Sequence, residues 1–187
     1  MSQYNSHNDQ PKVLKIALIG DPNSGKSTLF NRLTGANQQI GNWPGVTVEQ
    51  KNGKYYDRTA QLEVEVVDLP GCYSLVATDD MPLDEQVTCR YFLNNQATVY
   101  INVVDASRLS RDLYLTLQII ESGIKPIIAL NCVDLAEAAG LQIDLQALAK
   151  LLDCPVVPIV ARTGKNIDQL KLQIAHRSKQ DLIQQNS

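Results

Sequence analysis

The chain has 187 residues, of which 44% are hydrophobic and 20% are charged, so it is long enough for one sizeable core and short for two. Its 17 Lys and Arg residues against 20 Asp and Glu give a net charge of −3 without any basic run, which argues against a nucleic-acid partner. No apolar stretch approaches the roughly 18 residues that a membrane-spanning helix needs, so we expect this chain to be soluble.

Cysteine and histidine usage excludes several kinds of site. The four cysteines lack the spacings of zinc ribbons and redox pairs, and they fit a reduced cytosolic setting. The two histidines, His7 and His176, lie in polar segments near the termini. A histidine general base, a Ser/His/Asp triad and a histidine-rich metal site are therefore nearly excluded.

The elements predicted in the first half of the chain surround a long loop. Residues 1–12 are polar, lack the apolar centre of a signal peptide and predict a disordered leader. A strand is predicted at 13–19, a helix at 28–33 that Gly35 closes, and strands at 54–56 and 62–67. Residues 36–47, rich in Gly, Asn and Gln, are predicted as a loop, and loops of this length are usually functional.

The second half alternates regularly. Helices are predicted at 83–93, 109–121, 145–151 and 167–175, and strands at 99–104, 126–130 and 156–160. The strands are apolar on both faces, so we predict an α/β domain over 13–175 in which helices cover both faces of a mainly parallel sheet. Ligands bind such sheets at the carboxyl ends of their strands. The polar tail, 176–187, is predicted to be a linker or a frayed helix end.

A phosphate-binding loop follows the first predicted strand, with the sequence Gly20-Asp21-Pro22-Asn23-Ser24-Gly25-Lys26-Ser27. Its glycines let the backbone fold around phosphates, and the positive end of the next helix adds to the attraction. Lys26 should reach the β- and γ-phosphates, and the Ser27 hydroxyl should ligate magnesium. The predicted nucleotide-binding residues of this segment are Asn23, Ser24, Gly25, Lys26, Ser27 and Thr28.

Three further motifs follow later strands, and the last two of them predict a guanine base. Asp68 begins an Asp-x-x-Gly turn, where its carboxylate would hold magnesium through water and the Gly71 amide could sense a γ-phosphate. Asn131 begins an Asn-x-x-Asp motif whose Asp134 can accept two hydrogen bonds from guanine, although such residues also cap helices. After the last predicted strand, the Ala161 amide could reach the guanine O6.

Thr47 lies in the long loop, where a GTPase uses a threonine to bind magnesium and the γ-phosphate. A lone threonine before a strand usually reflects β-propensity alone, but the order of motifs makes it a predicted ligand. That order is typical of a Ras-like P-loop GTPase, with a mostly parallel six-stranded sheet that contains one antiparallel strand.

Four segments resemble the ferrous-iron transport protein B (FeoB) family over residues 15–174. They are Gly41-Asn42-Trp43-Pro44-Gly45-Val46-Thr47-Val48-Glu49, Asp68-Leu69-Pro70-Gly71-Cys72-Tyr73-Ser74-Leu75, Leu83-Asp84-Glu85-Gln86 and Ile101-Asn102-Val103-Val104-Asp105-Ala106. The resemblance implies a GTP-hydrolysing regulatory domain of a bacterial Fe(II) uptake transporter, at the cytoplasmic face of the inner membrane. It also implies helical and membrane regions beyond 176–187 as partners. Direct iron binding by this domain is not expected, because its cysteines are scattered and its core lacks histidine.

The sequence departs from the family pattern at three positions. Asp21 replaces an asparagine, Cys132 replaces a lysine or methionine in the base motif, and Val160 stands where serine is common. The short Cys132 side chain covers the guanine face less than a lysine stem would, so we expect comparatively fast GDP release.

The catalytic residues implied are Lys26, Thr47, Gly71 and Asn23. Cys72 occupies the position where Ras-like enzymes carry a water-orienting glutamine, so another group must help. The resemblance implies a potassium ion bound by Asn23, although Asn23 could also be only a turn residue. If potassium is not used, Arg162, Arg58 or a partner's side chain could supply the missing charge.

Two other functions fit parts of the sequence. An Era-like ribosome-assembly or tRNA-modification GTPase would share the motifs, but such proteins usually carry basic attachments. The second is a nucleotide-gated interaction module with incidental hydrolysis. Such a module would exchange GDP for GTP without appreciable hydrolysis.

Overall fold

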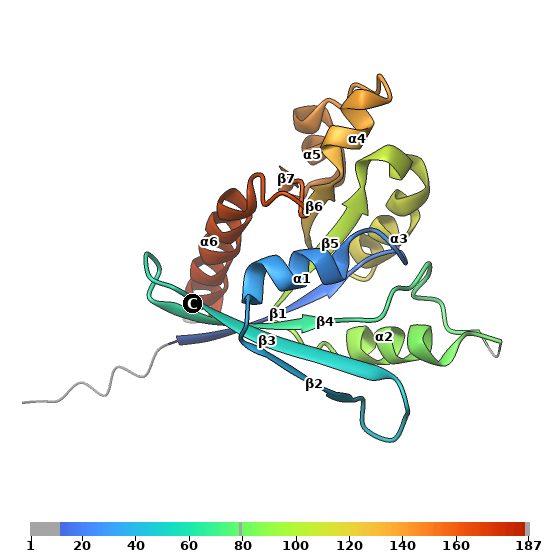
Figure 1. Ribbon diagram of the computed structural model, residues 1–187, viewed down its shortest axis with the longest axis vertical. Coiled ribbons are helices and arrows are strands. Elements are labelled where there is room, and N and C mark those ends of the chain that lie inside the picture. Colours follow the sequence, from blue (N-terminus) through green and yellow to red (C-terminus); the bar gives the residue numbers. More distant parts are fainter. Residues whose placement is uncertain (1–11, 79, 186–187) are drawn as a thin grey trace, which may run out of the picture.

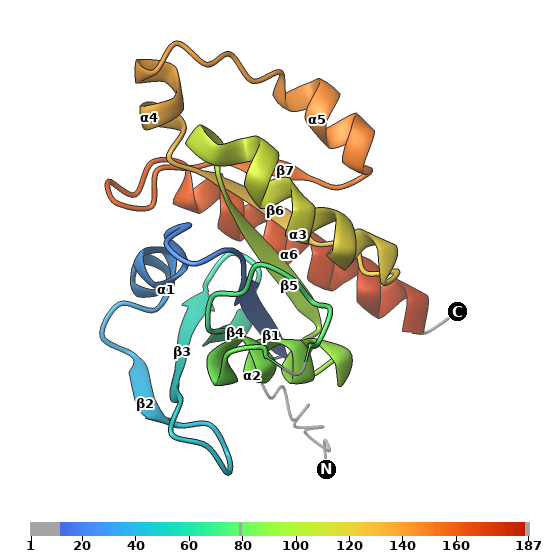
Figure 2. The ribbon, with the colours of Figure 1, turned by 90° about the vertical axis from the view of Figure 1, so that its right-hand side faces the viewer.

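The computed structural model describes residues 12–78 and 80–185. The predicted leader therefore lies outside the described residues except for Lys12, which begins the first strand. A single sheet runs through the domain in the order β2-β3-β4-β1-β5-β6-β7, with helices packed on it (Figures 1 and 2). Among the described residues, no helix combines the length and the apolar character needed to cross a membrane.

The sheet is mostly parallel, as predicted. Its strands are β1 (Lys12–Ile19), β2 (Gln38–Asn42), β3 (Glu49–Asp57), β4 (Leu62–Asp68), β5 (Val99–Asp105), β6 (Ile127–Asn131) and β7 (Val156–Pro158). Only β3 runs against its neighbours β2 and β4, while the pairs β4–β1–β5–β6–β7 are all parallel. The predicted single antiparallel strand is confirmed.

The number of strands differs from the prediction, seven instead of six. The extra strand, β2, lies inside the segment predicted as a loop and pairs with β3 from Gln38↔Gly53 to Asn42↔Glu49. Its side chains are almost all exposed, so it has no apolar alternation by which sequence could reveal it. Main-chain hydrogen bonding to β3 holds it instead.

The helices are α1 (Lys26–Thr34), α2 (Leu83–Leu93), α3 (Leu109–Glu121), α4 (Val133–Ala138), α5 (Leu145–Leu152) and α6 (Ile167–Gln185), and the 3-10 helix η1 (Ala106–Arg108) precedes α3. The short α4 was not predicted. The predicted strand over 156–160 ends at Pro158, and Val160 forms an isolated bridge with Lys165. Helix α6 continues through most of the polar tail 176–187, of which residues 186–187 lie outside the description.

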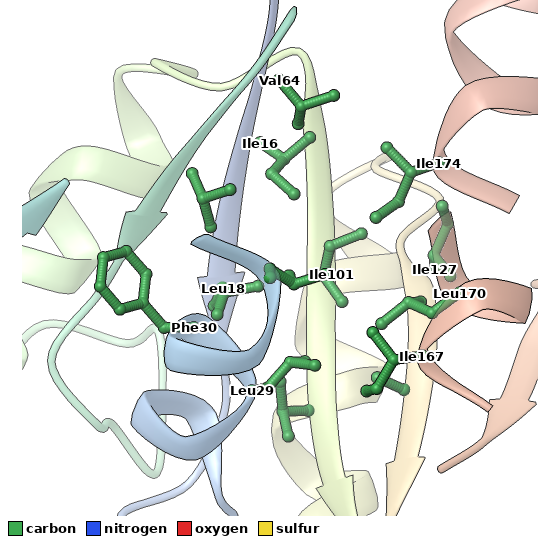
Figure 3. Packing of buried hydrophobic residues seen from close by; sticks show 14 of the residues in the cluster. Ile16, Leu18, Leu29, Phe30, Val64, Ile101, Ile127, Ile167, Leu170 and Ile174 are labelled. Carbon is green, nitrogen blue, oxygen red and sulfur yellow. The ribbon is translucent and has the colours of Figure 1, made fainter. Parts of the chain in front are cut away.

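Two apolar layers cover the sheet. On one face, α1 and α6 pack against the strands, and Figure 3 shows Leu29 and Phe30 of α1 on one side of Ile101 and Ile167 and Ile174 of α6 on the other. On the other face, α2 and α3 contribute Tyr91, Phe92, Leu115 and Ile119. Burial of both faces explains why β5 and β6, which are buried at every position, carry few polar side chains, and it confirms the prediction of helices on both sides.

The carboxyl ends of the central strands carry the motif residues. Asp68 ends β4, Asp105 ends β5 and Asn131 ends β6, and the P-loop follows β1 between β4 and β5. Because these four strands are parallel neighbours, their carboxyl ends meet along one edge of the sheet. The fold therefore gathers the predicted motifs at one place.

Candidate functional site

The P-loop turns tightly between β1 and α1. Asn23 and Gly25 adopt left-handed backbone conformations, with φ of 65° and 95°. A Cβ on Gly20 would lie 2.4 Å from the carbonyl oxygen of Val103, and one on Gly25 would lie 2.2 Å from Asn131 Nδ2. Both glycines are therefore required by close approach of the neighbouring strands' residues.

Lys26 spans the mouth of this loop. Its Nζ donates to the carbonyl oxygens of Gly20 at 3.0 Å and Asp21 at 2.7 Å, although the side chain is buried. Burial lowers the pKa of Lys26, and the charges of Asp68 and Asp21 oppose that shift. The ammonium group thus lies where phosphate oxygens could replace the two carbonyls as acceptors.

Ser27 and Asp68 meet beside this lysine. The Ser27 hydroxyl donates to Asp68 Oδ2 at 2.8 Å. Asp68 is 7% exposed, and its Oδ1 is buried without a hydrogen-bond partner in residues 12–78 and 80–185. Burial raises the pKa of Asp68, while the Ser27 hydrogen bond and the Lys26 charge lower it. A hydroxyl and a carboxylate with a free buried oxygen are hard donors that suit magnesium, so the residues fit that ion.

The Asp-x-x-Gly turn closes directly on the P-loop. The Cys72 amide donates to the Gly20 carbonyl at 3.2 Å. A Cβ on Gly71 would lie 2.8 Å from Pro22 Cα, so only glycine permits this approach. Gly71 is therefore placed next to the loop, where its amide was predicted to sense a γ-phosphate.

Thr47 does not lie beside the P-loop residues and Asp68. It is an exposed residue in the connection between β2 and β3, which runs from Trp43 to Val48. Figures 1 and 2 show this β2–β3 hairpin projecting away from α1 and the P-loop. Trp43 is buried against α2, with its ring centroid 5.5 Å from that of Tyr91. A role for Thr47 at the phosphates therefore requires the hairpin tip to move.

A groove of about 680 Å³ runs under the same hairpin. Its lining includes Lys15, Trp43, Lys54 and Tyr91. None of the predicted nucleotide-binding residues lines it, so it is separate from the candidate site.

The base motif joins three loops through one side chain. Asn131 is buried, its Nδ2 donates to the Ser24 carbonyl at 2.9 Å, and its Oδ1 accepts the Ala161 amide at 3.0 Å. This amide was predicted to bind the guanine O6, and here it is engaged by Asn131 instead. The structure thus adds a scaffolding role for Asn131 and places Ala161 beside the P-loop.

Asp134 is the second residue of α4 and is half-buried at the edge of this group. Its Oδ2 lies 3.5 Å from Nη2 of Arg162, whose side chain is 78% exposed. The carboxylate is therefore open to a ligand at the cost of one weak ion pair.

Three arginines around the site escaped prediction. Arg32 of α1 donates from Nε to the Ala161 carbonyl at 3.0 Å and from Nη2 to the Arg162 carbonyl. Arg108 donates to the Asn23 carbonyl at 3.4 Å, and Arg111 lies 3.4 Å from the Asp21 carboxylate. These contacts join segments far apart in the sequence, so local sequence patterns do not predict them.

Arg111 also contacts the segment after the Asp-x-x-Gly turn. Its guanidinium lies 4.7 Å from the ring centroid of Tyr73. The same segment is held to α3 by Gln118, which accepts the Leu75 amide at 2.8 Å. Arg111 therefore links the P-loop to this neighbouring segment.

Known proteins resemble this chain in sequence and in fold. Residues 14–174 match the family described as ferrous iron transport protein B. The Fe(2+) transporter FeoB of Salmonella typhimurium is 52% identical over 174 residues, which cover 92% of this chain and 22% of that protein. This chain therefore spans about a fifth of the length of such relatives.

Solved structures share the fold. The cytosolic domain of L. pneumophila FeoB is 45% identical with a TM-score of 0.83, over 87% of this chain and 69% of that one. A GDP form of the T. maritima FeoB cytosolic domain is 39% identical with a TM-score of 0.82, over 89% of this chain and 64% of that one.

Proposed function

The chain belongs to the ferrous iron transport protein B family, and on this premise we propose that it binds GTP and hydrolyses it to GDP and phosphate. The observation that supports this most is the pairing of Ser27 with Asp68 at 2.8 Å, within reach of the Lys26 charge. A lysine, a hydroxyl and a carboxylate gathered at a P-loop suit a nucleoside triphosphate with its magnesium ion. The Era-like alternative is set aside because the family match covers residues 14–174.

Each residue of the site has a proposed task. The Lys26 ammonium would exchange the Gly20 and Asp21 carbonyls for β- and γ-phosphate oxygens. Ser27 and Asp68 would hold magnesium, which neutralises phosphate charge when bound. In hydrolysis, a water oxygen attacks the γ-phosphorus, the bond to the β–γ bridging oxygen breaks, and the water proton passes to the released phosphate. The Gly71 amide would sense the γ-phosphate, and Thr47 would join only after the β2–β3 hairpin closes.

Base selection falls to the loops that Asn131 holds together. The Asp134 carboxylate would accept hydrogen bonds from the two guanine donors, which adenine lacks. With adenine, these acceptors would lose their partners at a cost of about 2 to 3 kcal/mol. The Ala161 amide would exchange Asn131 Oδ1 for the guanine O6.

Potassium is proposed as a second cation. Asn23 is exposed, and within the described residues its side chain forms no hydrogen bond that would have to break. Its amide oxygen therefore suits a weakly held monovalent ion, which would add positive charge beside the phosphates. In a longer protein, nucleotide state would act on helical and membrane regions at the cytoplasmic face of the inner membrane, where Fe(II) is taken up.

The test is phosphate release by the purified chain with GTP or ATP in magnesium, beside equilibrium binding of both. We expect GTP and GDP to bind at least about a hundredfold tighter than ATP, and Lys26→Ala to lose hydrolysis. Asp134→Asn should shift preference toward xanthine nucleotides, whose O2 accepts from an amide. Comparable ATP and GTP affinities would contradict the base assignment. Normal nucleotide exchange without phosphate release would favour the nucleotide-gated interaction module.

A further inference from the structure

Cys132, in the Asn-x-x-Asp motif, has a side chain too short to cover the face of a bound base. This residue precedes α4 with a left-handed backbone, φ 59° and ψ 30°, and its short side chain is half-buried. A lysine at this position would place a long apolar stem beside a bound nucleotide. Cys132 cannot do so, which raises the question of what holds a nucleotide on this side of the site.

Arg108 lies on that side. It ends η1, which packs against α4, and Figure 2 shows α4 beside the start of α3. Burial and the charges of Asp105 and Asp134 raise the pKa of the Cys132 thiol, while Arg108 and Arg162 oppose the shift. Because η1 packs against α4 and Cys132 precedes α4, Arg108 lies on the same side of the site as Cys132.

The same guanidinium contacts the P-loop. Arg108 Nη2 donates to the carbonyl oxygen of Asn23 at 3.4 Å. Asn23 is one of the two left-handed residues of the loop, so its carbonyl is at the point where the P-loop turns. Arg108 therefore bridges the base-motif side of the site and the phosphate side.

Asp105 holds Arg108 in place. Its Oδ2 lies 3.1 Å from Arg108 Nε and 3.0 Å from Nη2. The other carboxylate oxygen accepts from the amide and hydroxyl of Ser107 at 2.9 and 2.7 Å, and Asp112 accepts the Asp105 amide at 2.9 Å. The Arg108 side chain is 34% exposed. It is therefore oriented before any ligand binds, unlike Arg162, which makes one contact at 3.5 Å.

We infer that Arg108 is a positioning residue that retains the nucleotide, taking over the cover that Cys132 does not give. Its guanidinium braces the P-loop at Asn23, and η1, which carries it, packs against the helix that Cys132 precedes. Loss of this brace would free the Asn23 turn and open a path for a nucleoside diphosphate to leave. The fast GDP release expected from Cys132 alone is therefore slowed by Arg108. This inference rests on the proposed nucleotide binding.

The experiment is stopped-flow release of a fluorescent GDP from the whole chain. Arg108→Ala should release it about five- to tenfold faster, as expected for the loss of one hydrogen bond as long as 3.4 Å. The release rate of Arg108→Lys should fall between those of the parental chain and Arg108→Ala. Arg90→Ala is the matched control, because Arg90 is an exposed arginine of α2 to which no role in the site is assigned, and it should leave the rate unchanged.

The decisive arm is rescue by Cys132→Lys. In the Arg108→Ala background it should bring release back toward the parental rate, whereas in the parental chain it should change the rate by less than about twofold. A purely structural role for Arg108 would not be rescued in this way, and melting temperatures show whether each variant is folded. Parental release by Arg108→Ala, or absence of rescue in folded protein, overturns the inference. Failure of the parental chain to bind fluorescent GDP overturns the proposed function as well.

Discussion

The Arg32 guanidinium donates from Nε to the main-chain carbonyl of Ala161 at 3.0 Å, across 129 positions of sequence. Because the Ala161 amide also donates to Asn131 Oδ1 at 3.0 Å, this residue is held at both its main-chain polar groups. The helix that begins at the P-loop thus holds the loop that is proposed to contact the base. The P-loop and the segment around Ala161 are therefore connected through α1.

Arg32→Ala should loosen the loop at 161–164 without removing a ligand contact. We expect GDP release to rise several-fold and the free energy of unfolding to fall by about 1 kcal/mol, since Arg32 is exposed. Stopped-flow release and urea unfolding measure the two effects. Arg32→Lys, which can make one of the two hydrogen bonds, should be intermediate. An unchanged release rate in Arg32→Ala would show that the loop does not depend on this contact.

Thr47→Ala should lower hydrolysis by about 10- to 100-fold while leaving GDP affinity unchanged. The physical reason is that the β2–β3 hairpin lies away from the P-loop, so Thr47 can act only in a closed state that GTP stabilises. Phosphate release and GDP titration check the two parts. Thr59→Ala, in the exposed turn between β3 and β4, is the control and should behave as the parental chain. Parental hydrolysis by Thr47→Ala would refute its assignment.

The ends of the buried strands could be predicted from sequence, because buried strands are rich in apolar residues and the polar residue that follows marks their end. Asn131 follows an apolar run and Asp68 follows Val66 and Val67, and parallel strands place the two residues at one edge. Strand β2 could not be predicted, because its exposed polar residues carry no periodic signal. The roles of Arg32 and Arg108 depend on tertiary contacts 129 and 85 positions apart, which local patterns do not encode.

Potassium should accelerate GTP hydrolysis clearly over sodium at equal ionic strength. A monovalent ion at Asn23 would stabilise charge on the β–γ bridging oxygen, the task that an arginine finger performs elsewhere. Asn23→Ala should abolish the difference between the two salts and largely preserve GDP affinity. Equal rates in both salts would direct attention to Arg162 or a partner's side chain, since Arg58 lies at the far end of β3.

The last prediction concerns Asp21, which replaces the family's asparagine. The side chain is 3% exposed, and burial with the charge of Asp112 raises its pKa from 3.8 to about 6, although Arg111, Lys26 and Arg108 oppose the shift. The folded chain therefore binds a proton more tightly here than the unfolded chain. Stability contributed by this group is fully present below about pH 4 and is lost as pH rises through about 6.

Asp21→Asn should remove this dependence, because the amide does not titrate. Relative to that variant, we expect the parental chain to lose about 1 to 3 kcal/mol of unfolding free energy between pH 4 and pH 7. Urea unfolding at several pH values measures the difference. Asp153→Asn gives a control of opposite sign, because a hydrogen bond from Lys125 lowers the pKa of Asp153, so that its contribution is lost as pH falls. Parallel stability curves for the parental chain and Asp21→Asn would show that Arg111 and its neighbours fully offset the burial of Asp21.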